Sequence, residues 1–91
     1  MSQQPPVRFT LRLTNRLATP RTVVLEPWTG EYRLGAGEQL DIVVEGAPQT
    51  PLEVELHGDR VAIYAFDTTD AMLTAYRGGE ELRSEHTPPA G

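Results

Sequence analysis

The residue types that most often carry out chemistry are few in this sequence and stand far apart. Its two histidines are His57 and His86, and neither has a second metal ligand at the short, defined spacing typical of zinc sites. Cysteine is absent, which excludes disulfides, thiolate metal sites and cysteine nucleophiles together. The serines, Ser2 and Ser84, lie near the two ends, so they cannot join a histidine and an acid in a triad. We therefore expect no enzymatic activity, no metal and no other cofactor.

Two other short motifs are turns rather than ligand sites. Asp67 and Asp70 enclose two threonines, but the glycine and the terminal glutamate of a calcium-binding loop are missing. The glycine-rich segments at 35–37 and 78–79 are not followed by a helix whose first turn could receive a phosphate. Both patterns favour polar turns between extended segments.

The densest group of functional residue types comprises Glu26, Trp28, Glu31 and Tyr32, which we call the tryptophan cluster. A surface tryptophan flanked by carboxylates and a tyrosine can stack on a sugar ring or anchor a partner protein. A simpler interpretation is structural: Pro27 ends a strand, and Trp28 folds inward to plug one end of the fold. The sequence leaves these three interpretations open.

The elements that must hold these residues are short β-strands. From Val7 to Leu13, apolar residues alternate with arginine and threonine, the pattern of a strand with one buried face. Similar runs follow along the chain, separated by turns that contain glycine or proline. His57-Gly58-Asp59 and Gly78-Gly79 predict tight hairpin turns. No stretch shows the 3.6-residue period of a helix.

Seven or eight strands, with a turn about every 8–12 residues, predict an all-β fold. We expect an antiparallel two-sheet sandwich with immunoglobulin-like or cupredoxin-like architecture. A chain of 91 residues has room for one core, which we assign to residues 7–83. Residues 1–6 and 84–91 are polar and rich in proline, so we expect flexible ends. Two histidines without cysteine cannot supply the copper ligands of a cupredoxin.

Charge is unevenly distributed in a chain whose net charge is −5 and whose basic residues are all arginines. The first 21 residues contain four arginines and no acid. Arg8 and Arg12 share one face of a strand, so we predict cross-strand ion pairs with Glu53 and Glu55. The alternative is a nucleic-acid-binding or anion-binding arm, but an acidic protein without lysine lacks the broad basic surface that phosphate binding needs. We expect no nucleic-acid partner.

No segment has the features of a membrane anchor or a secretion signal. The N-terminal residues lack a charged region followed by an apolar run, and no segment approaches the roughly 18 apolar residues of a membrane helix. We therefore expect a cytoplasmic protein with no membrane partner.

Two predicted strands are apolar on both faces, at 61–66 and 71–76. A sandwich buries one face of each strand, so loops or another molecule must shield the other. The leading hypothesis is that the protein is a non-enzymatic protein–protein interaction module. It would bind either a second copy of itself, as a homodimer, or another protein. It would use these strands through Tyr64 and Tyr76, or the tryptophan cluster. The alternative is a small-ligand or carbohydrate binder that uses the tryptophan cluster.

A set of motifs extends over about residues 22 to 82. They are Val24-Leu25-Glu26-Pro27-Trp28, then Tyr32, Leu34, Gly37-Glu38, Leu40-Asp41-Ile42-Val43 and Pro51-Leu52-Glu53-Val54-Glu55. In these motifs the chain resembles a family of small bacterial proteins that share the Leu-Glu-Pro-Trp segment and a Gly-Glu turn and have no assigned activity. That family usually has Pro-Pro-Gly-Glu where this chain has Gly35-Ala36-Gly37-Glu38, so its loop is more flexible here. The resemblance implies a compact β fold and a non-secreted bacterial protein, and it implies no mechanism.

Overall fold

Strands form all the regular secondary structure in the computed structural model of this protein, which describes residues 5–28, 30–48, 50–66 and 70–82. Among these residues there are eight strands, and no helix that could span a membrane. The strands are β1 (Val7–Thr14), β2 (Arg21–Glu26), β3 (Gly30–Leu34), β4 (Gln39–Gly46), β5 (Glu53–His57), β6 (Arg60–Tyr64), β7 (Met72–Arg77) and β8 (Glu80–Glu81).

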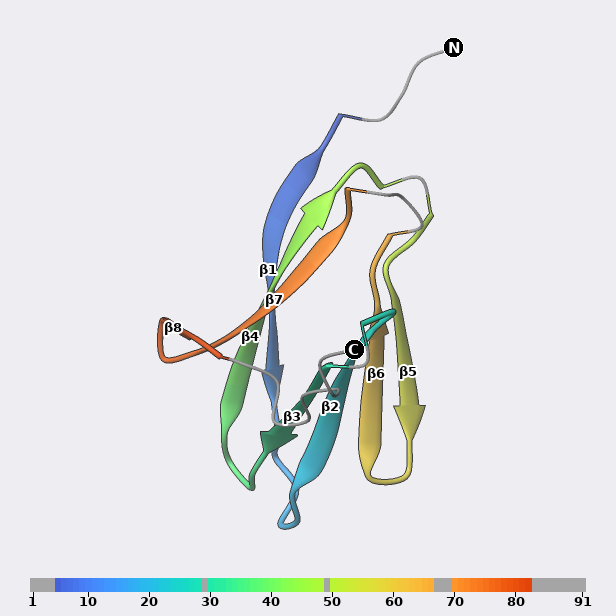
Figure 1. Cartoon of the computed structure of the whole chain (residues 1–91). Helices are drawn as coiled ribbons and strands as arrows, with labels where there is room; N and C mark the ends of the chain where they lie inside the picture. The colour runs from blue at the N-terminus through green and yellow to red at the C-terminus, as the bar shows by residue number, and fades with distance from the viewer. Residues whose placement is uncertain (1–4, 29, 49, 67–69, 83–91) are drawn as a thin grey trace, which may run out of the picture.

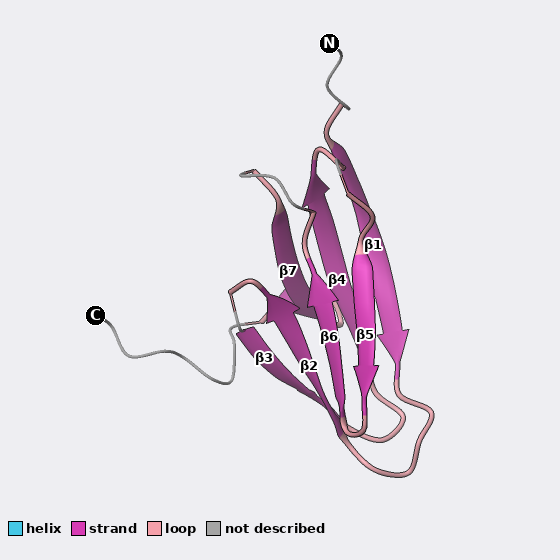
Figure 2. Ribbon diagram, turned by 90° about the vertical axis from the view of Figure 1, so that its right-hand side faces the viewer, coloured by secondary structure: helices cyan, strands magenta, loops and turns pink. Residues whose placement is uncertain are grey.

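The strands form two four-stranded sheets that face one another (Figures 1 and 2). The first sheet has the order β1-β4-β7-β8, and the second has the order β3-β2-β6-β5. The expected all-β, two-layer fold is thereby confirmed. The residues expected to be flexible ends lie mostly outside the described residues, as do Asp67 and the two threonines that follow it.

The second sheet is mixed, so the expectation of purely antiparallel pairing is wrong there. β2 and β6 run parallel, with Thr22 beside Arg60 and Glu26 beside Tyr64. Parallel neighbours cannot be joined by a tight turn, and here the chain passes through β3, β4 and β5 between them. Alternation within each strand predicts which face is buried, but it does not specify the direction of the neighbouring strand.

The core lies between the sheets and consists of the apolar residues that alternation directs inward. On β4, Leu40, Ile42 and Val44 are fully buried, and they face Val23 and Ile63 from the second sheet. The period-two pattern of the sequence predicts the three inward positions of β4 correctly. The complete buried cluster is Val23, Leu25, Tyr32, Leu34, Leu40, Ile42, Val44, Ile63, Phe66, Leu73 and Ala75.

Both predicted hairpin turns are confirmed. His57 lies opposite Arg60 at the start of the β5–β6 hairpin. Gly78 and Gly79 join β7 to β8 with φ angles of 58° and 84°, the left-handed conformation that a two-residue hairpin turn favours. By contrast, the connection from β1 to β2 is a corner between the two sheets rather than a hairpin.

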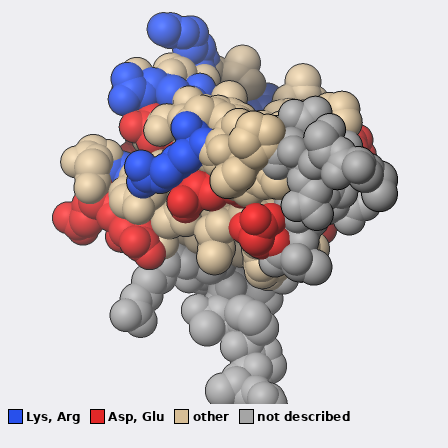
Figure 3. Space-filling model, turned by 90° about the horizontal axis from the view of Figure 1, so that it is seen from above, with Lys and Arg blue, Asp and Glu red and all other residues tan. Residues whose placement is uncertain are grey.

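The arginines of β1 pair with β4 and not with the acids predicted from the sequence. Arg12 forms a two-point hydrogen bond with Asp41, with Nε–Oδ1 and Nη2–Oδ2 distances of 2.8 and 3.1 Å. The Arg8 Nε lies 3.5 Å from Glu45 Oε2. Glu53 and Glu55 are excluded as partners because β5 belongs to the other sheet. The face seen in Figure 3 accordingly shows arginines and carboxylates lying next to one another.

Candidate functional site: an open edge between the sheets

The structure divides the tryptophan cluster between the two faces of the second sheet. Tyr32 lies opposite Val23 on the inner face and is 8% exposed, and its pKa is raised by burial and, to a smaller extent, by nearby Glu81. Glu31 is the neighbouring residue and therefore belongs to the outer face. Trp28 is 43% exposed, so the interpretation that it plugs the core is wrong.

Tyr64 and Tyr76 lie on opposite outer surfaces of the sandwich. Tyr64 sits beside Glu26 on the outer face of the second sheet. Tyr76 lies between Asp41 and Glu81 on the outer face of the first sheet. The six residues singled out from the sequence therefore do not converge on one site: Tyr64, Glu26 and Glu31 share a face, and the others are placed elsewhere.

Tyr64 takes part in a small polar network on the outer face of the second sheet. Its hydroxyl donates a 3.0 Å hydrogen bond to Glu55 Oε1, and His57 Nε2 lies 3.2 Å from the same oxygen. The Tyr64 hydrogen bond, followed by that of His57, lowers the pKa of Glu55, and the same contact raises the pKa of Tyr64. This network holds the Glu55 carboxylate in place, and the neighbouring acid Glu53 makes a further, smaller contribution to the lowering of the Glu55 pKa.

Replacing Tyr64 by phenylalanine is expected to raise the pKa of Glu55 toward the ordinary glutamate value of about 4.3, because it removes the largest cause of the lowering. A carboxyl whose folded pKa is lowered stabilises the fold above its unfolded pKa, and this stabilisation is lost as pH falls through the folded pKa. The variant should therefore lose less stability than the wild type in that acidic range. Carbon-13 NMR titration of the side-chain carboxyl measures the pKa directly.

The pKa of Asp41 is the internal control for this titration. This pKa is lowered by the hydrogen bond from Arg12, and both residues belong to the first sheet, away from Tyr64. The pKa of Asp41 should therefore be the same in the wild type and in Tyr64→Phe. An unchanged Glu55 pKa in the variant would show that the Tyr64 hydrogen bond does not form in solution.

β1 and β5 lie on the same side of the sandwich (Figure 2). Five of the seven exposed large apolar side chains among the described residues belong to these two strands or to the loop after β1, and the other two are Trp28 and Met72. β1 is the edge strand of the first sheet and β5 is the edge strand of the second. Leu56 is 81% exposed, although it lies opposite Val61 on the inner face. Val54 and Phe9 also occupy inner-face positions and are 43% and 41% exposed. The two sheets are therefore not closed over one another at this edge.

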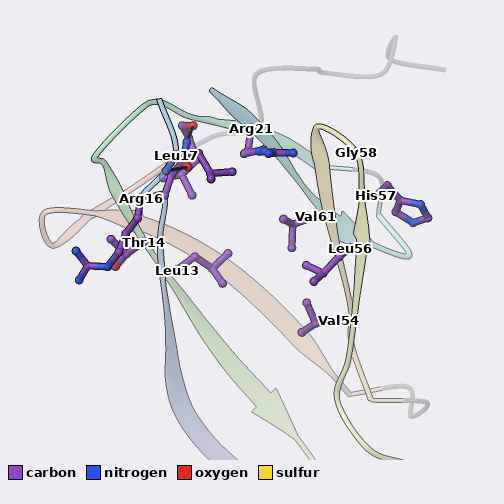
Figure 4. Close-up of a pocket in the computed structure, with 12 residues that line it drawn as sticks. Leu13, Thr14, Arg16, Leu17, Arg21, Val54, Leu56, His57, Gly58 and Val61 are labelled. Atoms are coloured by element: carbon purple, nitrogen blue, oxygen red, sulfur yellow. Dashed lines mark hydrogen bonds between the residues drawn. The ribbon is translucent and has the colours of Figure 1, made fainter. Parts of the chain in front are cut away.

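The hollow between these edges is the β1/β5 groove, with a volume of about 400 Å³. Figure 4 shows Leu13, Val54, Leu56 and Val61 pointing toward its centre, while Arg16 and His57 point away. Its apolar lining residues are Leu13, Leu17, Leu34, Val54, Leu56 and Val61. Among the residues that the structure describes, no aspartate or glutamate lines the groove.

Arg21 lies across one end of the β1/β5 groove (Figure 4). It lies opposite Leu34 and two residues before Val23, so alternation directs its side chain between the sheets. The Nε atom is buried and has no hydrogen-bond partner among the described residues. A buried guanidinium nitrogen without an acceptor is energetically unfavourable, so this arginine is a candidate anion-binding group.

Asn15 holds the loop that forms this end of the groove. Its side chain is buried, and Nδ2 lies 2.9, 3.1 and 3.2 Å from the carbonyl oxygens of Thr19, Leu34 and Gly35. Its Oδ1 accepts a 3.0 Å hydrogen bond from the Leu17 N–H. These bonds tie the loop after β1 to the end of β3, and they fix the positions from which Leu17 and Arg21 reach the groove. The sequence carries no sign of this role, because Asn15 stands in an ordinary polar turn.

Each edge strand also has unused backbone groups. β1 pairs with β4 alone, and β5 pairs with β6 alone, among the described strands. The outer side of each strand therefore presents N–H and C=O groups to which a further strand can bind. Within the same described ranges, no three histidine, aspartate or glutamate side chains gather closely enough to hold a metal ion.

No protein-family model, curated protein or solved structure matches this chain.

Proposed function

We propose that this protein is a non-enzymatic protein-interaction module that accepts an extended segment of a partner polypeptide at the β1/β5 groove. The observation that carries the proposal is the uncovered inner face of β5, where Leu56 is 81% exposed at a position that alternation directs toward the core. An exposed apolar patch of this kind marks an interaction site. The free backbone edge beside it favours a partner strand over a globular surface.

The chemistry of β5 defines the partner segment. Val54 and Leu56 line the groove, whereas Glu53 and Glu55 lie on the opposite face of the same strand. An added strand would place alternate side chains over these two sets. Its inward residues should therefore be apolar and its outward residues basic or polar.

A second copy of the chain contains such a segment, since β1 alternates apolar residues with Arg8 and Arg12. Homodimer formation is therefore one outcome of the test described below. We further propose an immunoglobulin-like or cupredoxin-like architecture, supported by the two opposed four-stranded sheets. The parallel β2–β6 pair is a departure from the antiparallel sheets of an immunoglobulin domain.

A displayed library of random decapeptides with free carboxyl ends, selected on the immobilised protein, tests the proposal. We expect enriched peptides with alternating apolar and basic residues. Replacing Leu56 by glutamate should weaken their binding by about tenfold or more, because a carboxylate would replace the most exposed apolar contact in the groove. Fluorescence anisotropy of the labelled peptides provides the dissociation constants.

The matched control is Thr10→Glu, which adds the same charge to an exposed position on the outer face of β1. It should change peptide affinity less than twofold. Failure to enrich any peptide, or equal binding to the wild type and Leu56→Glu, would contradict strand addition at this groove. Sedimentation velocity of the wild type and Leu56→Glu shows whether a second copy occupies the groove instead.

A further inference from the structure

We infer that the partner segment ends in the groove, and that Arg21 binds its C-terminal carboxylate. This inference rests on the proposed function and names the feature of the partner that the same groove recognises. The module would then bind apolar C-terminal tails of partner proteins rather than internal segments.

Arg21 occupies an unusual position for a charged residue. Charged residues normally occupy the outer face of a half-buried strand, yet Arg21 is in phase with Val23 and Leu25, which are both core residues. Its guanidinium therefore lies between the sheets, at the end of an apolar groove (Figure 4). An inward arginine at this point costs desolvation energy that an anionic ligand would offset.

The Arg21 side chain has a donor that no described residue satisfies. Arg21 Nε is buried and has no hydrogen-bond acceptor among the described residues, and no carboxylate side chain lines the groove. A guanidinium offers donors in a planar fork that matches the two oxygens of a carboxylate. In the apolar surroundings of Leu17, Leu34 and Val61, such a charge-assisted pair is stronger than it would be in water.

The direction of the edge strands indicates which end of a partner segment reaches Arg21. The groove is lined by the last residues of both β1 and β5, so both strands run toward the end at which Arg21 lies (Figure 2). A partner segment that runs parallel to β5 would therefore arrive at Arg21 with its carboxyl end. Its last inward side chain would contact Leu17 and Leu56, which predicts an apolar C-terminal residue.

The test compares the labelled hexapeptide KLKVKV as a free acid and as a C-terminal amide. The peptide alternates basic and apolar residues and ends in valine, as the groove requires. We expect the acid to bind the wild type at least tenfold more tightly than the amide in fluorescence anisotropy titrations. With Arg21→Gln the two forms should bind equally, and with Arg21→Lys the preference should be reduced but still present, because the charge is kept and the fork is lost.

The outcomes separate this inference from the function on which it rests. If the acid and the amide bind the wild type equally, and both are weakened by Leu56→Glu, the inference is overturned and strand addition stands. If neither form binds, both are overturned. Hexanoate is a competitor that offers a carboxylate and an alkyl chain but no peptide backbone. If it displaces the free-acid peptide at an equal concentration, the ligand is a small molecule rather than a peptide, and the inference is overturned. Thermal unfolding of Arg21→Gln provides the check that the variant is folded.

Discussion

Replacing Ile63 by alanine is expected to lower the free energy of unfolding by about 2–5 kcal/mol. Ile63 is fully buried at the centre of β6, where it pairs with Leu25 on one side and Val54 on the other. Removal of its side chain beyond Cβ leaves a cavity between the sheets that close packing prevents from collapsing fully. Urea unfolding followed by Trp28 fluorescence or circular dichroism measures the loss.

The matched substitution is Leu56→Ala on the adjacent edge strand. Leu56 faces the same way as Ile63 but is 81% exposed, so its truncation should change the free energy of unfolding by no more than about 0.5 kcal/mol. Equal losses for the two variants would mean that the groove is closed in solution and that Leu56 belongs to the core.

Replacing Asn15 by alanine is expected to lower the free energy of unfolding by about 2–4 kcal/mol. The substitution removes the donor to three carbonyl oxygens and the acceptor of the Leu17 N–H, and these backbone groups would remain in a partly buried site. Truncation of one partner therefore leaves several polar groups without hydrogen bonds, which costs more than the lost bonds alone. Urea unfolding of the variant provides the measurement.

Thr14→Ala is the control for Asn15, because Thr14 is the preceding residue and is exposed. It should unfold at nearly the same urea concentration as the wild type. The position of the loop provides a second measurement. Asn15→Ala should also weaken the binding of the hexapeptide KLKVKV, because Leu17 and Arg21 depend on this loop for their placement. A stable Asn15→Ala variant with full peptide affinity would contradict this account of the loop.

The core and two turns of this fold could be predicted from the sequence because they depend on local rules. Alternation alone directs Leu40 and Ile42 inward, and the glycines at 78 and 79 specify a tight turn before any neighbouring strand is known. In each case the information lies within a few consecutive residues.

The pairing of the strands could not be predicted in the same way. Arg8 and Arg12 need acidic residues on a neighbouring strand, and the sequences of both β4 and β5 contain such residues. Only the strand order of the structure places β4 beside β1, so the ion pairs form with Asp41 and Glu45. The groove was missed for a related reason. Leu56 and Ile42 both occupy apolar positions of alternating strands, and their difference in exposure arises because β5 has a neighbour on one side only, whereas β4 lies between two strands.

One signal of the candidate site was present in the sequence. Arg21 stands two residues before Val23 and four before Leu25, so it occupies an inward position of its strand. A charged residue in phase with the core is unusual enough to deserve a search for its partner. The role of Asn15 has no such local signal, because its acceptors come from residues distant in the sequence as well as from its own loop.

The parallel contact between β2 and β6 has a consequence for how fast the chain can fold. The β5–β6 hairpin joins residues that are close in the sequence and can form within microseconds, whereas Thr22 must pair with Arg60 across the 37 residues that separate them in the sequence. Topologies dominated by such distant pairings fold in milliseconds to seconds. During this interval the apolar residues of β6 lack their β2 neighbour, so the nascent protein passes through a period in which aggregation competes with folding.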